Sequence, residues 1–134
     1  MTNHYRDRET NTIAKMYKKF GLDTSTTPNL MTPDLCLERE EKMREELDEF
    51  SAAWMSGDLA KAADALIDLV VFAKGTAVMM GLPWRELFQE VNRANMSKER
   101  GVAPNRPNHS QDLIKPEGWI APRIDQILSN YLED

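Results

Sequence analysis

The sequence predicts an all-α protein with a four-helix core, formed as a single domain by residues 1–134. Three observations favour this fold class. Residues that cap and end helices recur along the chain. Between them, apolar residues return every three or four positions, as they do on one face of a helix. Alternating apolar and polar runs, which are typical of strands, are missing from the sequence.

Start and stop signals place the helices at about residues 11–20, 33–57, 59–80 and 83–97, with a short last helix at about 122–131. Thr32 and Pro33 open the second helix, because Thr is a good N-cap and Pro is favoured at the first helical position. Asp58 caps the third helix, and Gly81 follows its end. Residues 98–118 form a long loop rich in Pro and Asn, and loops of this length are usually functional or disordered.

Composition excludes several classes of function. The net charge is −5, and no basic stripe is present, so we expect no nucleic-acid partner. The single Cys36 excludes an intrachain disulfide and a cysteine-based zinc site. The first residues, MTNHYRDRETN, do not resemble a signal peptide, and no run of 18 apolar residues indicates a membrane span. We therefore expect a cytoplasmic protein with no membrane partner.

The second helix carries four acids within five positions: Glu45, Glu46, Asp48 and Glu49. None of them has a Lys or Arg three or four residues later, and the next base is Lys61. We expect the helix to bury one apolar stripe: Met43, Leu47, Phe50 and Trp54. On this arrangement Glu46 and Glu49 border the core. Glu45 lies further round the helix but can reach toward the same side, and Asp48 lies on the solvent-facing surface. A solvated acidic face is the alternative interpretation.

The third helix is apolar on nearly every side between Ala62 and Ala73, as a buried helix is. Asp64 and Asp68 interrupt it four residues apart, on one face. An unpaired buried carboxylate costs several kcal/mol, so it needs a cation, hydrogen bonds or a proton. Gly75 lies on the same face and leaves room there. Salt bridges within the core are the alternative.

The fourth helix places Asn95 in the middle of its apolar stripe, which consists of Trp84, Leu87, Phe88 and Val91. Lys98 returns to this stripe one turn later, and Asn92 lies on its flank. Polar groups on an inward face indicate contact with a polar ligand. A C-terminal Asn cap and a Lys that serves the helix dipole are the alternative.

Together these residues predict one site. Carboxylates are hard oxygen donors that suit Mg²⁺, or Mn²⁺, better than zinc or copper. Mg²⁺ is commonly shared between carboxylates, water and substrate phosphates, so Asn92, Asn95 and Lys98 are expected to meet a phosphorylated ligand. Glu46 is the candidate general base, because it lies closest to the expected core.

Four stretches resemble the all-α nucleoside triphosphate pyrophosphohydrolases, that is, the MazG-like and phosphoribosyl-ATP pyrophosphohydrolase-like families. They are REEKMREELDEF, LAKAADALIDLVVFAKGTAVMMGL, LFQEVNRANMSKERG and LIKPEGWIAP, which follow in order over roughly residues 35–122. A helical EExxE motif is weak alone, but its combination with ADALxDL, GTA and NMSK is specific. The chain is most similar to small stand-alone members, including those carried by phages.

The resemblance implies a homodimer or a dimer of dimers, and a Mg²⁺-dependent enzyme that cleaves (d)NTPs between the α and β phosphates. The products are a nucleoside monophosphate and pyrophosphate. The implied metal ligands are Glu45, Glu46, Glu49, Asp64 and Asp68. Asn95 and Lys98 match the NMSK motif that meets substrate, and Lys115 matches a phosphate contact in KPEGW. Much of the superfamily has Glu where this chain has Ala65, which leaves the number of metal ions open.

Other functions are weighed against this one. A P-loop motif is missing from the sequence, and the only histidines, His4 and His109, fall outside the expected helices, which argues against a di-iron bundle. Phosphoribosyl-ATP hydrolysis is the alternative within the same chemistry. A catalytically silent helical module that binds a nucleotide or a protein is the alternative from another class.

Overall fold

The computed structural model describes residues 7–132, so residues 1–6, with His4, and residues 133–134 of the predicted domain lie outside the described part. The elements are α1 (Arg8–Lys19), α2 (Pro33–Met55), α3 (Leu59–Met80), α4 (Trp84–Met96), β1 (Glu99–Arg100), β2 (Leu113–Ile114) and α5 (Ile124–Ser129). The all-α prediction is confirmed. No single helix among the described residues is long and apolar enough to cross a membrane.

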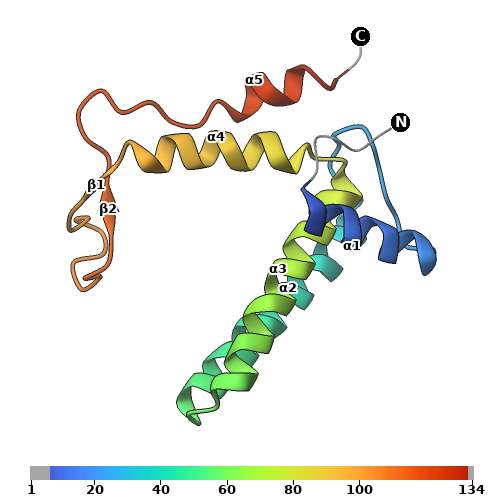
Figure 1. Cartoon of the computed structure of the whole chain (residues 1–134), viewed down its shortest axis with the longest axis horizontal. Coiled ribbons are helices and arrows are strands. Elements are labelled where there is room, and N and C mark those ends of the chain that lie inside the picture. The colour runs from blue at the N-terminus through green and yellow to red at the C-terminus, as the bar shows by residue number, and fades with distance from the viewer. Residues whose placement is uncertain (1–6, 133–134) are drawn as a thin grey trace.

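The long helices α2 and α3 lie antiparallel and form the main helix pair of the molecule (Figure 1). The predicted caps are confirmed. Thr32 accepts a hydrogen bond from the backbone of Leu35, and Asp58 accepts one from the backbone of Lys61 at 3.0 Å. Gly81 ends α3 with a φ of 66°, a left-handed conformation that glycine adopts without strain.

Helix α1 begins at Arg8, earlier than the expected Asn11, because Asp7 caps it by accepting a hydrogen bond from Thr10 N at 2.7 Å. It packs across the C-terminal half of α3. A small apolar core forms there from Ile13, Ala14, Tyr17, Val78 and Met79. The buried Lys74 of α3 forms ion pairs with Asp7 at 3.1 Å and Glu9 at 3.0 Å. These contacts fix α1 on α3.

The space beside Gly75, expected to stay open, is filled by Tyr17. A Cβ atom at Gly75 would lie within 2.5 Å of Tyr17 Cζ. The Tyr17 hydroxyl accepts a hydrogen bond from the buried Arg39 of α2 at 2.5 Å, and Arg39 also donates to Thr76 Oγ1 at 3.0 Å. Gly75 therefore serves the packing of three helices and leaves no room for a ligand.

Helix α4 leaves the α2–α3 pair, because the chain turns by 119° between α3 and α4 (Figure 1). The α5 segment returns alongside α4, and Glu90 of α4 accepts hydrogen bonds from Arg93 and from the backbone of Arg123. These charge-assisted bonds lower the pKa of Glu90 from 4.5 to about 2. Helix α5 is shorter than the expected 122–131.

The segment 98–118, expected to lack strands, contains a short antiparallel pair, in which Glu99 faces Ile114 and Arg100 faces Leu113. Two-residue strands are too short to produce an alternating pattern, so the sequence did not reveal them. An ion pair between Arg106 and Asp112, 3.0 Å apart, ties the connecting loop together. The segment is thus an ordered hairpin.

The face that α2 turns toward α3 differs from the prediction. Arg39, Glu46 and Ala53 are buried, whereas Leu47 is 50% exposed and Trp54 is 72% exposed. Met43 and Phe50, the other two members of the predicted stripe, are only half-buried, so within one chain the stripe is not the main contact with α3. Small and polar side chains form the contact with α3 instead.

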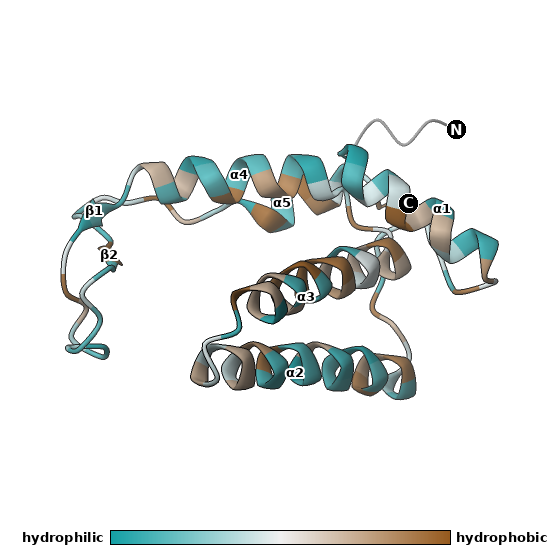
Figure 2. Ribbon diagram, turned by 60° about the horizontal axis from the view of Figure 1, so that its bottom comes forward, coloured by the Kyte–Doolittle hydropathy of each residue, from teal (hydrophilic) through white to brown (hydrophobic). Residues whose placement is uncertain are grey.

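Helices α3 and α4 also expose apolar side chains that were expected in the core. Ile67 and Val70 of α3 are 63% and 46% exposed, and Phe88 of α4 is 60% exposed. Figure 2 shows hydrophobic colour over much of α3, whereas α2 is mostly hydrophilic. The expected burial of α3 on all sides is therefore wrong for the single chain, because α4 leads away from the helix pair.

Candidate functional site

The candidate site is built around Glu46, which α2 holds against α3. The residue is only 8% exposed, and its Oε1 atom has no hydrogen-bond partner in the described part of the chain. Desolvation by burial raises the pKa of Glu46 from 4.5 to about 7, and three neighbouring carboxylates contribute: Glu49, Asp68 and Asp64. The structure therefore places four of the five carboxylates that the sequence predicts near one another on facing helices, although not at metal-ligand distances.

The four acids come from two facing helices. Glu49 lies one turn beyond Glu46 on α2, while Asp64 and Asp68 lie one turn apart on α3. Glu49 and Asp64 are exposed and Asp68 is half-buried, so the group opens from a buried carboxylate toward solvent. Glu45 is exposed and is not among the groups that raise the pKa of Glu46. It stands apart from the other four.

The donor set suits a divalent cation. Within residues 7–132, no three acidic, His or Cys side chains lie close enough to hold a metal ion as they stand. A buried carboxylate oxygen without a partner is nevertheless the kind of atom that a cation satisfies, and the surrounding donors are hard oxygens. Glu46, Glu49, Asp64 and Asp68 fit Mg²⁺ or Mn²⁺, with movement of the exposed side chains.

Ala65 is 2% exposed and lies in the contact between α2 and α3. The Glu that much of the superfamily has at this position would point into the same contact. Asp64 is one residue earlier and exposed, so it adds a charge beside Glu46 from a different direction. This geometry distinguishes the present acid set from an E-x-x-D arrangement.

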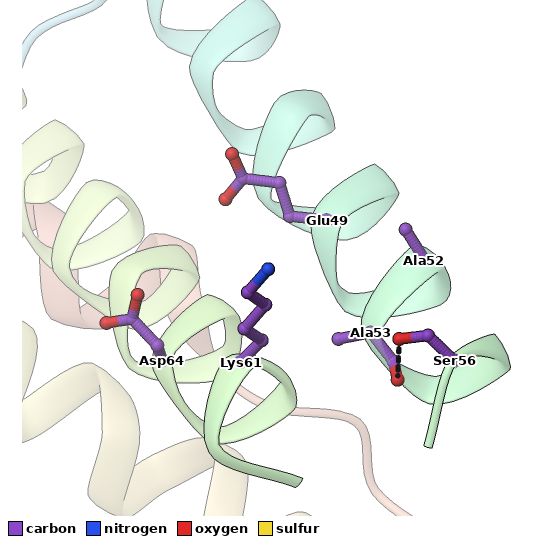
Figure 3. Close-up of a pocket in the computed structure, with 6 residues that line it drawn as sticks. All are labelled: Glu49, Ala52, Ala53, Ser56, Lys61 and Asp64. Atoms are coloured by element: carbon purple, nitrogen blue, oxygen red, sulfur yellow. Dashed lines mark hydrogen bonds between the residues drawn. The ribbon is translucent and has the colours of Figure 1, made fainter. Parts of the chain in front are cut away.

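A cavity of about 410 Å³ adjoins the acids at the end of the helix pair where a short loop joins α2 to α3. It is lined by Glu49, Ala52, Ala53, Ser56, Lys61 and Asp64. The Lys61 ammonium points into the space between Glu49 and Asp64 (Figure 3). No ion pair joins Lys61 to an acid in the part of the chain that the structure describes. Lys61 is therefore a cation next to the acids, and the sequence pattern did not assign it to the site.

The predicted substrate residues lie on another part of the molecule. Asn92 and Asn95 are exposed on α4, so the expected inward position of Asn95 is wrong for the single chain. Lys98 follows α4 and Lys115 follows β2, at the end of α4 that lies opposite the α2–α3 pair (Figure 1). One chain therefore does not bring the predicted acids and the predicted cations together.

Trp119 organises the two lysines. The Nζ atoms of Lys98 and Lys115 lie 5.4 Å and 5.0 Å from the centre of its indole ring. Its Nε1 donates a hydrogen bond of 2.8 Å to the carbonyl of Ala94, in the last turn of α4. Trp119 was not among the site residues that the sequence predicts. The only signal was its place in KPEGW, close after Lys115.

Comparison with known proteins adds one finding. The model of the phosphoribosyl-ATP pyrophosphohydrolase family matches residues 13–95. This range contains every candidate metal ligand together with Asn92 and Asn95, and it ends before Lys98 and Lys115. A search of curated proteins gave no match.

Proposed function

Since the chain belongs to the phosphoribosyl-ATP pyrophosphohydrolase family, and with it to the all-α nucleotide pyrophosphohydrolases, we propose that it hydrolyses nucleoside triphosphates between the α and β phosphates. The observation that carries this proposal is the buried Glu46 carboxylate, with an unpartnered oxygen, among Glu49, Asp64 and Asp68. A nucleoside monophosphate and pyrophosphate are the products.

The acids would hold Mg²⁺, or Mn²⁺, which neutralises charge on the phosphates when it is bound. Glu46 accepts the proton of the attacking water. Its buried carboxylate lies beside the acids that would hold the metal, which is where the attacking water is expected. As the water oxygen bonds to phosphorus, the anhydride bond between the α and β phosphates breaks, and Lys98 and Lys115 stabilise the charge of the departing pyrophosphate.

The active enzyme is a homodimer or homotetramer in which the cations of one copy serve the acids of another. Three observations support this. The acids and the lysines lie apart in one chain (Figure 1). Neither Lys98 nor Lys115 has an ion-pair partner within residues 7–132. Leu47, Trp54 and Phe88 are at least half exposed, and association removes such apolar surface from water.

The direct test incubates the purified protein with Mg²⁺ and each common NTP and dNTP, and resolves the products by ion-exchange chromatography. Monophosphate plus pyrophosphate from any of them supports the proposal and ranks the bases. Diphosphate plus inorganic phosphate refutes the assigned bond. The Glu46→Gln variant, checked for folding by circular dichroism, is the control for a contaminating enzyme.

Phosphoribosyl-ATP is the second candidate substrate, because the matching family model carries that name. The same acids and the same bond cleavage serve either substrate. Parallel incubations with phosphoribosyl-ATP and with the NTPs distinguish them by the larger kcat/KM. Turnover of neither substrate points to a silent binding module, and the proposal then fails.

A further inference from the structure

The hairpin arm, defined here as residues 98–119, borders an open cavity of about 750 Å³. Small-molecule sites typically measure roughly 300–1,000 Å³. The cavity is separate from the acid group on α2 and α3, and its walls come from both sides of the β1–β2 pair. Its size suits a nucleoside with a phosphate.

The arm is built to keep this cavity open. A Cβ atom at Gly101 would lie 2.7 Å from Ile114 Cδ1, so the two strands pack closely there. Arg106 forms two hydrogen bonds to Asp112, at 3.0 Å and 3.2 Å, which close the loop on the far side. Trp119 anchors the arm on the end of α4. A pre-formed pocket lowers the ordering cost of binding its ligand.

The charge of the cavity suits an anion. Lys98 and Lys115 line it and share the Trp119 ring, and neither has an ion-pair partner within the described residues. The guanidinium of Arg106 is already paired with Asp112. The arm's other acids, Glu99 and Glu117, do not line the cavity. Two uncompensated ammonium groups at one pocket attract a phosphate.

The remaining lining suits a base and not a bare phosphate. Val102, Ala103, Pro104, Leu113 and Ile114 contribute apolar surface, and Asn105 adds an exposed amide that donates and accepts hydrogen bonds. Val102 is 61% exposed and Leu113 is 45% exposed, so this apolar surface lies open in the single chain. An apolar wall with a few polar groups is the usual composition of a small-molecule site.

From these features we infer that the arm cavity binds the nucleoside part of the substrate, with the phosphates passing Lys98 and Lys115. The inference rests on the function proposed above and extends it. On this inference residues 102–114 of the arm select the base, and the exposed aromatic residues of α2 and α4 do not.

The test fills the cavity with Leu113→Trp. Trp is favoured in strands, and Leu113 is 45% exposed, so the substitution adds volume without disturbing a core. Ile120→Trp is the matched control, because Ile120 is 51% exposed and does not line the cavity. Titration calorimetry measures the binding of the two products, nucleoside monophosphate and pyrophosphate, to the full chain with Mg²⁺.

We expect Leu113→Trp to weaken nucleoside monophosphate binding at least about tenfold and pyrophosphate binding less than about twofold. Ile120→Trp changes neither. Unchanged monophosphate binding in Leu113→Trp, an equal loss of both products, or no monophosphate binding by the natural sequence overturns the inference. So does loss of the oligomer in sedimentation, since a second copy would then fill the cavity. Absence of NTP hydrolysis with selective loss of monophosphate binding would overturn only the proposed reaction.

Discussion

A mixing experiment tests whether two copies of the chain build one active site. One variant, Glu46→Gln, removes the central acid, and the other, Lys98→Ala, removes a cation on the arm. Each is expected to be inactive as a pure protein. Glu46 belongs to α2 and Lys98 follows α4, and the α2–α3 pair and the hairpin lie at opposite ends of α4 (Figure 1), so a shared site takes one residue from each copy.

The expected recovery follows from this geometry. In a mixed dimer one site receives both defects and the other receives neither. Random exchange makes half of the dimers mixed, and each of these carries one intact site out of two. The mixture should therefore recover about one quarter of the natural activity for a closed two-fold dimer. A tetramer built from such dimers gives the same fraction.

The assay measures pyrophosphate release after the two variants are unfolded together and refolded as an equal mixture. Mixing Glu46→Gln with Asp68→Asn is the control, because both changes affect the acid side and leave no intact site in any combination. Activity no higher than that of the separate variants would show that each site belongs to one chain, and would refute the shared arrangement.

Three further predictions follow from single residues. Glu46→Gln and Asp68→Asn should each abolish turnover and retain the circular dichroism spectrum of the natural protein; residual turnover in a folded variant argues against the assignment. Because the pKa of Glu46 is raised from 4.5 to about 7, its contribution to stability in EDTA should be most favourable below pH 4.5 and decline as the pH rises through 7. Glu46→Gln should then raise the melting temperature at pH 8 but not at pH 4, and equal shifts at both would contradict the cause given. Gly75→Ala should lower the free energy of unfolding in urea by about 1–3 kcal/mol, since the added methyl overlaps Tyr17; no change would show that Tyr17 moves away freely.

The sequence predicted the features that depend on neighbours in the chain. The caps at Thr32 and Asp58 and the stop at Gly81 form where expected, because each joins a side chain or a glycine to backbone a few residues away. The same holds for Asp64 and Asp68, whose separation of four residues places them on one face of α3.

The sequence could not predict which helix faces would be covered. The helical period shows that Leu47 and Trp54 share a stripe with Phe50, but it does not say what packs against that stripe. The direction of α4 depends on the turn at Leu82 and Pro83, and this turn carries Asn95 away from the acids. The positions of Lys61 and Trp119 depend on contacts between elements, so a single sequence gave little sign of them.

The acids lie on α2 and α3 and the lysines lie on the arm, and this separation has a consequence for truncated copies of the chain. The contacts that hold α1, α2 and α3 together lie mainly within residues 7–81, so this part can fold without α4 and the arm. A copy that stops before the arm would keep its acids and its exposed apolar faces but lose both lysines. Such a copy would pair with intact chains and inactivate the sites that need its arm. Each mixed pair would nevertheless keep one intact site, formed by the acids of the truncated copy and the arm of its partner, so a shortened copy is expected to leave the activity per intact chain unchanged.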